Sequence, residues 1–200
     1  WLTAQEIALA GVELRALRVN YVGELGWELH VPMARLPEVY DAVWAAGEAH
    51  GIADFGLYAV NALRLEKAYR GWGAELTNEI TMIEADMARF VDFEKPDFTG
   101  RAATRISQSK PETRLVYLEV DAKDADPRGG EPLFADGACI GVVTSGGYGH
   151  ACGKSLAFAY AQPQRIGSGV ALEIEILGEL RAARILEQPA YDPGNHRLRG

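Results

Sequence analysis

The chain has 200 residues, a formal net charge of −8, and hydrophobic and charged fractions of 48% and 24%. These values are ordinary for a globular protein and exclude wholesale disorder, while the length allows one large domain or two small ones. We expect no nucleic-acid and no membrane partner, because these need basic patches or an apolar run of about 20 residues, and the sequence has neither.

The first part of the chain mixes strand and helix patterns. Apolar and polar side chains alternate over residues 14–31, which predicts a β-hairpin with a glycine-containing turn at residues 23–26 and polar groups at its tip. Apolar residues then recur at helical spacing over residues 36–44, before two glycines stop the segment. This succession indicates an α+β region.

Residues 56–73 form the densest structural pattern in the chain. Apolar side chains from Leu57 to Leu65 follow helical spacing, and charged side chains gather at the end, so we expect a buried helix with polar groups at its C-terminus. Gly71 and Gly73 favour backbone angles that other residues resist, which predicts a shaped loop after the helix.

The sequence changes character near residue 110. A short helix is predicted over residues 101–107, with Thr99 as its N-cap. The polar, proline-containing stretch at residues 107–113 is typical of a domain boundary. We therefore divide the chain into a first domain of residues 1–109 and a second domain of residues 110–200.

Strand patterns dominate the second domain. Short segments of strand-forming residues are separated by Gly, Pro and Asp turns, which favours a small antiparallel β-barrel. The predicted strands cover residues 114–120, 139–144, 155–161, 170–176 and 181–186. The expected fold class is α+β, with an α+β domain followed by a C-terminal antiparallel β-barrel.

Cys139 and Cys152 are the two cysteines of the chain. Nothing near them has the paired Cys/His spacing of a zinc site, so we expect no metal site. Two buried thiols are the expectation, and one disulfide is the alternative. The chain begins at Trp1 rather than Met, and we expect it to be a fragment of a longer protein.

The hairpin tip at residues 20–28 is the first candidate binding site. Glu24 and Glu28 lie four residues apart among glycines, with Tyr21 and Trp27 beside them. A flat heterocycle would stack on an aromatic ring while a carboxylate accepts hydrogen bonds from a pair of its N–H groups. The alternative is an ordinary hairpin whose acids face water.

The glycine-rich residues 145–149 and the adjacent His150 form a second candidate. They lie between two predicted strands, whereas a phosphate-cradling loop opens a helix, so we expect no nucleotide site there. A catalytic role for His150 is not favoured, because no nucleophile with a recognisable elbow accompanies it.

The end of the predicted helix at residues 56–73 offers structural roles. Arg64 and Glu66 would form an ion pair, either with each other or with the hairpin, and fix geometry rather than catalyse. Tyr69 and Trp72 are expected to pack against the core, with pocket lining as the alternative.

Several motifs together resemble the glycine-cleavage T-protein family, the tetrahydrofolate-dependent aminomethyltransferases. They are YVGELGWE at residues 21–28, LRLEK at residues 63–67 and VTSG at residues 143–146. LRLEKAYRGWGAELT from residue 63, FTGR from residue 98 and YDPGNHRLR from residue 191 look most like the branch of this family found in dimethylglycine and sarcosine dehydrogenases. The resemblance covers nearly the whole chain.

The resemblance implies a fold and a cofactor. Residues 1–109 would be the C-terminal portion of a folate-binding α+β domain, and residues 110–200 the C-terminal β-barrel of the family. Glu28 would hold the pterin of tetrahydrofolate, with Tyr21 near the ring. A carboxylate suits this role because a pterin presents adjacent N–H donors in one plane.

The resemblance also implies an activity, namely transfer of a one-carbon unit to N5 of tetrahydrofolate. The unit would be released as an iminium from a small methylamine-type substrate, while the protein positions the reactants and stabilises charge. We expect a dimethylglycine or sarcosine dehydrogenase-like demethylase in the bacterial cytoplasm or the mitochondrial matrix. FAD, if used, would belong to an upstream domain of the same polypeptide.

Two departures from the family pattern matter. Val60 stands where aminomethyltransferases carry an arginine that contacts folate, so that contact is lost or supplied elsewhere. The family's catalytic aspartate falls upstream of Trp1, so we expect no catalytic residue here and no activity from the fragment alone. Two alternatives stay open: a structural or docking module with a vestigial folate pocket, and a folate-dependent S- or O-demethylase.

Overall fold

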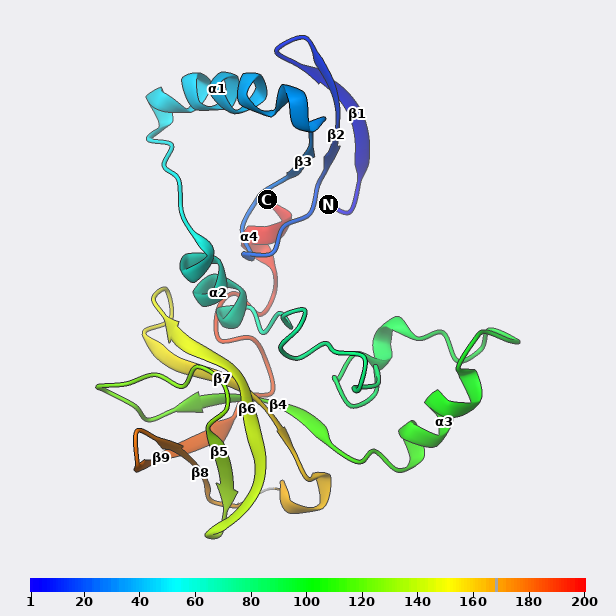
Figure 1. Ribbon diagram of the computed structural model, residues 1–200, viewed down its shortest axis with the longest axis vertical. Helices are drawn as coiled ribbons and strands as arrows, with labels where there is room; N and C mark the ends of the chain where they lie inside the picture. The colour runs from blue at the N-terminus through cyan, green and yellow to red at the C-terminus, as the bar shows by residue number, and fades with distance from the viewer. Residues whose placement is uncertain (168) are drawn as a thin grey trace. The chain divides into compact units, whose positions relative to one another are not determined.

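The computed structural model describes residues 1–167 and 169–200 (Figure 1). The chain forms two compact units, one made of Trp1–Leu63 with Asp192–Gly200 and the other of Arg64–Tyr191. The domain division at residues 109 and 110 rests on the sequence pattern and stays a prediction.

The first unit contains a three-stranded antiparallel sheet in the order β1-β2-β3. Its strands are β1 (Ala4–Leu9), β2 (Val12–Leu17) and β3 (Glu28–His30). The pairing of β2 with β3 confirms the predicted hairpin. The predicted tight turn at residues 23–26 is wrong, because the two strands are joined by the long loop of residues 18–27. Strand β1, which is joined to β2 by a tight turn, was not predicted.

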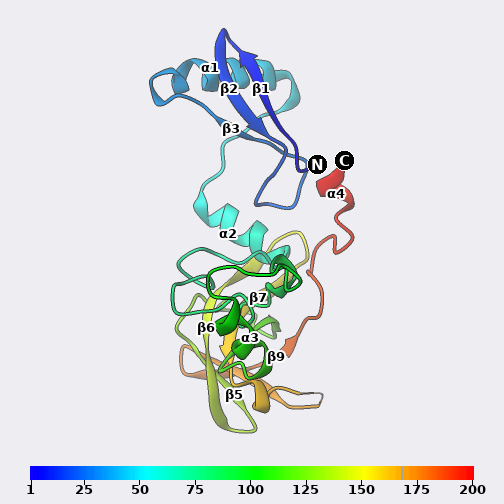
Figure 2. The same ribbon diagram turned by 90° about the vertical axis from the view of Figure 1, so that its right-hand side faces the viewer.

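Helix α1 (Leu36–Gly47) confirms the helical pattern predicted after the hairpin. It lies along the sheet of its own unit in Figures 1 and 2, and Val39 packs on Val12 and Leu14. The short 3-10 helices η1 (Met33–Arg35) and η2 (Glu48–His50) flank it. At the end, Gly51 adopts a φ of 72°, a conformation that glycine reaches without strain.

Helix α2 (Leu57–Glu66) is confirmed as a helix, but its predicted burial is wrong for its first turns. Leu57 and Tyr58 are 86% and 87% exposed, whereas Arg64, Leu65 and Glu66 at the other end are buried. Apolar spacing indicates which side chains are suited to burial, but what covers them depends on tertiary packing.

The segment between α2 and the barrel has little regular structure. It contains the 3-10 helix η3 (Ala88–Phe90) and helix α3 (Arg101–Ser109). Thr99 is not the N-cap of α3, because Gly100 occupies that position with a φ of 87° and no side-chain cap bond is made. Thr104 instead donates its hydroxyl hydrogen bond back to the Gly100 carbonyl.

The second unit contains the predicted β-barrel, which is closed in the order β4-β7-β6-β5-β8-β9. All neighbouring strands are antiparallel. The strands are β4 (Arg114–Val120), β5 (Pro132–Ala135), β6 (Ala138–Gly149), β7 (Lys154–Ala161), β8 (Leu172–Ile176) and β9 (Glu179–Ile185). The 3-10 helix η4 (Pro163–Arg165) follows β7, and helix α4 (His196–Arg199) ends the chain. The sequence analysis missed the short β5.

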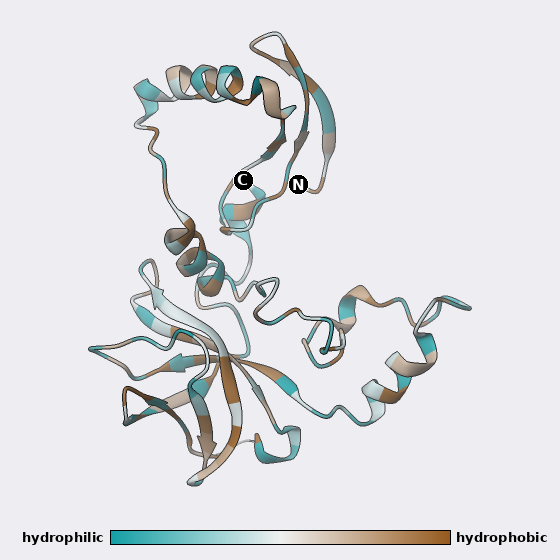
Figure 3. Cartoon of the chain, viewed as in Figure 1, coloured by the Kyte–Doolittle hydropathy of each residue, from teal (hydrophilic) through white to brown (hydrophobic). Residues whose placement is uncertain are grey.

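Strand β7 shows why this sequence forms a barrel with two buried faces. Small side chains, from Ala157 to Ala161 in alternate positions, point into the barrel core. The large side chains that alternate with them pack outside the barrel in a second cluster that includes Leu65; they are Leu156, Phe158 and Tyr160. Alternating small and large residues suit a narrow barrel that is also covered from outside. The first half of the neighbouring β6 is likewise hydrophobic in Figure 3.

Candidate functional site

The loop of residues 18–27 is shaped by Asn20. Its side-chain oxygen accepts hydrogen bonds from the backbone N–H groups of Val22 and Gly23, at 3.1 and 2.8 Å, and its amide nitrogen donates to the Glu24 carbonyl. An asparagine that bonds its own following backbone in this way defines a turn. These hydrogen bonds hold the loop from within.

Arg18 anchors the other side of this loop. Its guanidinium donates to the carbonyls of Gly26 and Leu198, at 3.1 and 3.2 Å, and lies 4.8 Å from the centre of the Trp27 ring. Arg18 is only 8% exposed, so the aromatic face replaces part of the water it has lost. Beside this pair lies a cavity of about 470 Å³, which is also lined by Ala16 and Leu29.

Glu28 begins β3, directly after the loop, and its side chain remains 52% exposed. One Glu28 oxygen lies 3.6 Å from His30 Nε2, and the carboxylate has water-facing positions at which a ligand would donate hydrogen bonds. Tyr21 lies within the loop and is 38% exposed. An exposed carboxylate and an exposed phenol ring fit the chemistry of a pterin, which has N–H donors along one edge and a flat apolar face.

Trp27 ends the loop and lines the same cavity as Leu29 and Ala16. Glu28 and Tyr21 do not line that cavity. The expectation that Tyr21 or Trp27 stacks on a heterocycle held by a carboxylate of this loop stays a prediction for both rings.

The end of α2 and the loop after it carry a buried charge cluster. Arg64 forms an ion pair with Glu75 at 2.9 Å, and the two side chains are 5% and 0% exposed. The Glu75 carboxylate also accepts hydrogen bonds from the Gly71 N–H at 2.6 Å and the hydroxyls of Thr144 and Ser145 at 2.5 and 2.6 Å. An ion pair was predicted for Arg64, but its partner Glu75 was not. The signal was an acid two residues after Gly73, inside the predicted loop.

Glu66 does not make its predicted pair with Arg64, because its carboxylate caps a turn of the barrel. One of its oxygens accepts hydrogen bonds from the N–H groups of Ala151 and Cys152, at 2.6 and 3.2 Å. A Cβ at Gly149 would approach the Glu66 Cγ to 2.8 Å. A glycine is therefore needed at residue 149 for packing.

The glycine-rich residues 145–149 belong to β6, which corrects the loop expected there. His150 lies in the following turn with its ring edge-on to Tyr148, at a centroid distance of 5.1 Å. Trp72 is 83% exposed, so the expectation that it packs is wrong. Its exposure follows from its position on the loop after α2, away from the strand faces that form the core.

Two buried tyrosines join this segment to the outer face of the barrel. Tyr117 donates to the Leu65 carbonyl at 2.8 Å, and Tyr160 donates to the Glu75 carbonyl at 2.7 Å. Burial, with nearby acid charges adding to it, raises the pKa of both phenols. The two hydroxyls therefore stay protonated hydrogen-bond donors.

Both cysteines are free thiols; Cys139 is exposed, which corrects its expected burial, and Cys152 is half-buried. Burial raises the pKa of Cys152, and the Glu66 charge acts in the same direction. Within residues 1–167 and 169–200, no cluster of His, Cys, Asp or Glu has the arrangement to hold a metal ion. Over the same residues, no helix has the length and apolar character to cross a membrane.

The fold and the loop motif define the class of protein: an α+β chain whose last part is a closed six-stranded barrel. Two family models match it, the GCVT N-terminal domain at residues 1–95 and the glycine cleavage T-protein C-terminal barrel domain at residues 113–192. The chain therefore belongs to the glycine cleavage T-protein family.

Relatives include mouse dimethylglycine dehydrogenase, which is 39% identical over 99% of this chain and 23% of its own length. Mouse sarcosine dehydrogenase is 34% identical over 99% of this chain and 22% of its own length. The aminomethyltransferase of Saccharopolyspora erythraea is 36% identical over 92% of this chain and 50% of its own length. The chain thus spans half or less of each of these relatives.

A solved structure is also similar. The glycine cleavage system aminomethyltransferase T from Bartonella henselae superposes with a TM-score of 0.81 and 28% identity, over 90% of this chain and 50% of that one.

Proposed function

We propose that this chain is part of a tetrahydrofolate-dependent one-carbon transferase that demethylates an N-methylated amine. The observation that carries the proposal is the half-exposed Glu28 carboxylate in a family-specific loop motif. Similarity to dimethylglycine and sarcosine dehydrogenases supports the choice of a small methylamine-type donor. Relatives named as mitochondrial proteins support a mitochondrial location, and the bacterial cytoplasm is the alternative.

The role of the described residues is to hold and orient the cofactor. Glu28 would accept hydrogen bonds from two N–H groups at the edge of the pterin, and Tyr21 would stack on the face of the pterin ring. The bonds of Asn20 and Arg18 keep the loop in place before any ligand arrives, which reduces the entropy lost on binding. When bound, tetrahydrofolate supplies the nitrogen that receives the one-carbon unit.

The position of Val60 affects the proposal. The side chain is apolar and partly buried on α2, so it offers no charge to the acidic end of a folate. We therefore expect the pterin contacts of Glu28 to carry a larger share of the affinity than in a relative with arginine at this position.

Calorimetric titration of tetrahydrofolate into the natural-length protein tests the proposal. The variant is Glu28→Gln, which keeps the shape but offers one acceptor oxygen in place of two. We expect affinity to fall at least tenfold, or about 1.4 kcal/mol. Glu13→Gln on the same sheet is the matched control, because Glu13 is also an exposed acid on a strand next to β3.

The outcomes separate the alternatives. Equal affinities of the two variants would remove Glu28 from the site. Absence of binding to the parent protein would overturn the folate proposal and favour a docking module. Folate binding without turnover of any N-methylated amine would favour a donor that carries its methyl group on sulfur or oxygen.

A further inference from the structure

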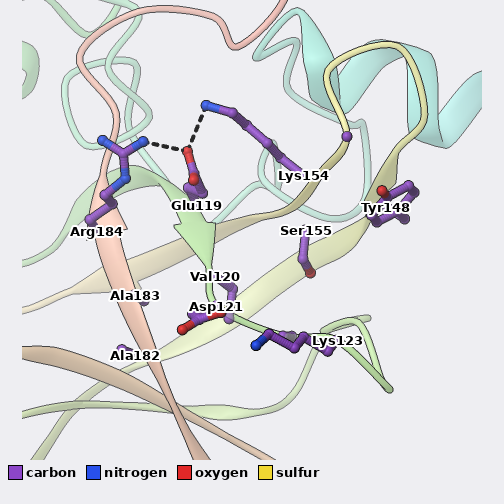
Figure 4. A pocket seen from close by; sticks show the side chains of 12 residues that line it. Glu119, Val120, Asp121, Lys123, Tyr148, Lys154, Ser155, Ala182, Ala183 and Arg184 are labelled. Carbon is purple, nitrogen blue, oxygen red and sulfur yellow. Dashed lines mark hydrogen bonds and ion pairs between the residues drawn. The ribbon is translucent and has the colours of Figure 1, made fainter.

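A second cavity lies at one end of the barrel. Its volume is about 550 Å³, and none of the predicted folate-binding residues lines it. Its walls come from residues 119–123 at the end of β4, residues 153–155 at the start of β7, residues 182–184 of β9 and Tyr148 of β6 (Figure 4). All of these residues belong to the compact unit Arg64–Tyr191.

Three charged side chains form one wall of this cavity. Lys154 Nζ and Arg184 Nη2 lie 2.8 and 2.7 Å from the same oxygen of Glu119, as the dashed lines of Figure 4 show. Burial alone would raise the pKa of Glu119, but hydrogen bonds and charges from the two cations lower it. Glu119 therefore stays ionised, and the group carries one net positive charge.

Lys123 adds a third cation on the other side of the cavity. In Figure 4 it lies away from the Glu119 group, with Asp121 near it. Its ammonium has no ion pair or hydrogen bond within residues 1–167 and 169–200. The cavity thus has three cations against the two acids Glu119 and Asp121, in a chain whose overall charge is −8.

Ser155 supplies an unused hydrogen-bond donor in the cavity wall. The residue is 3% exposed, and its hydroxyl has no partner in the part of the chain that the structure describes. Ser155 pairs with Val120 of β4 and Tyr148 of β6, and Figure 4 shows its side chain between the Glu119 group and Lys123. A buried hydroxyl without a partner is unfavourable, and an acceptor atom in the cavity would relieve this cost.

We propose that this cavity binds a small organic anion through a carboxylate or phosphate group. The charged group lies among Lys123, Lys154 and Arg184 and accepts the hydrogen bond of Ser155. The volume is in the range of small-molecule sites, about 300–1,000 Å³, and exceeds what an inorganic ion would fill. The exposed Tyr148 ring offers a surface for the rest of the ligand.

Calorimetric titrations of succinate and of glycerol 3-phosphate into the natural-length protein test this proposal and distinguish the two anionic groups. The test variants are Lys123→Gln and Ser155→Ala, and the matched control is Lys95→Gln, which removes an exposed lysine outside the cavity. We expect one probe to bind. Its affinity should fall about tenfold with Lys123→Gln and about threefold with Ser155→Ala, because one change removes a charge and the other a single hydrogen bond.

Two results would overturn the proposal. One is that neither probe binds at concentrations up to about 10 mM, beyond the range of weak specific affinities. The other is that Lys95→Gln weakens binding as much as Lys123→Gln, since the effect would then follow net charge alone. Thermal melts check the variants, and Ser155→Ala should melt no lower than the parent, because it removes only an unpaired hydroxyl. Glu28→Gln should leave the anion affinity unchanged.

Discussion

Replacement of Glu75 by Gln is the sharpest test of how the end of α2 is held to the barrel. Glu75 is fully buried, and both its carboxylate oxygens are used. One oxygen accepts from Arg64 and the Gly71 N–H, and the other from Thr144 and Ser145. The substitution keeps the size of the side chain but removes its charge, which leaves the Arg64 guanidinium without its acid partner.

The expected cost follows from the burial of this pair. Removing one member of a buried ion pair costs about 3–5 kcal/mol. Because Gln retains one acceptor oxygen, we expect the lower end, about 3 kcal/mol. For a chain of 150–250 residues, each kcal/mol shifts Tm by about 2–4 °C, so the melting temperature should fall by about 6–12 °C.

The assay is urea and thermal unfolding followed by circular dichroism and tryptophan fluorescence. Glu79→Gln is the control, because Glu79 lies in the same segment but is exposed. A loss below about 1 kcal/mol for Glu75→Gln, the usual value of an exposed pair, would contradict this expectation. The Arg64–Glu75 contact would then add no more than a surface ion pair does.

Two further predictions concern the same compact unit. Burial alone would raise the pKa of Glu84, but hydrogen bonds from Thr81 and the Glu112 N–H lower it below its ordinary value of 4.5. The stabilisation by Glu84 is therefore present above about pH 4.5 and is lost as the pH falls through the folded-state pKa. Glu84→Gln should lower the urea midpoint at pH 7, and the difference from the parent should shrink in acid. A difference that stays constant with pH would contradict this. Gly149→Ala should cost about 1–3 kcal/mol, because its Cβ would meet Cys152 and Glu66. Gly56→Ala, which enters open space, is the control, and equal urea midpoints of the two variants would show that the site relaxes freely.

The elements that were predicted correctly are those with strong local patterns. Strand β4 was predicted with its observed bounds, and α1 and α2 were predicted as helices. Strand β5 was missed because it is short and begins with Pro132, which carries no N–H to donate. The Thr99 cap was wrong because Gly100 in a left-handed conformation occupies the capping position instead.

The candidate site was predictable only in part. The motif of residues 21–28 selects Glu28 and Tyr21 from the sequence, and their exposure is compatible with the predicted role. The sequence does not show that Trp27 lines a cavity with Ala16 and Leu29, because that cavity forms only where the strands of the first unit pair. Nor does it indicate the barrel cavity, whose charged residues come from β4 and the loop after it, from β7 and from β9.

Residue type and spacings of a few residues were enough to predict helices α1, α2 and α3, the barrel strands other than β5, the family motifs and the acidic net charge. Tertiary structure alone decided which charged groups meet. Glu75 accepts hydrogen bonds from Thr144 and Ser145, about 70 residues away in the chain. Ser155 lies between Val120 and Tyr148, and its hydroxyl has no partner among the described residues. Contacts at such separations depend on how the barrel closes, and no local pattern encodes that closure.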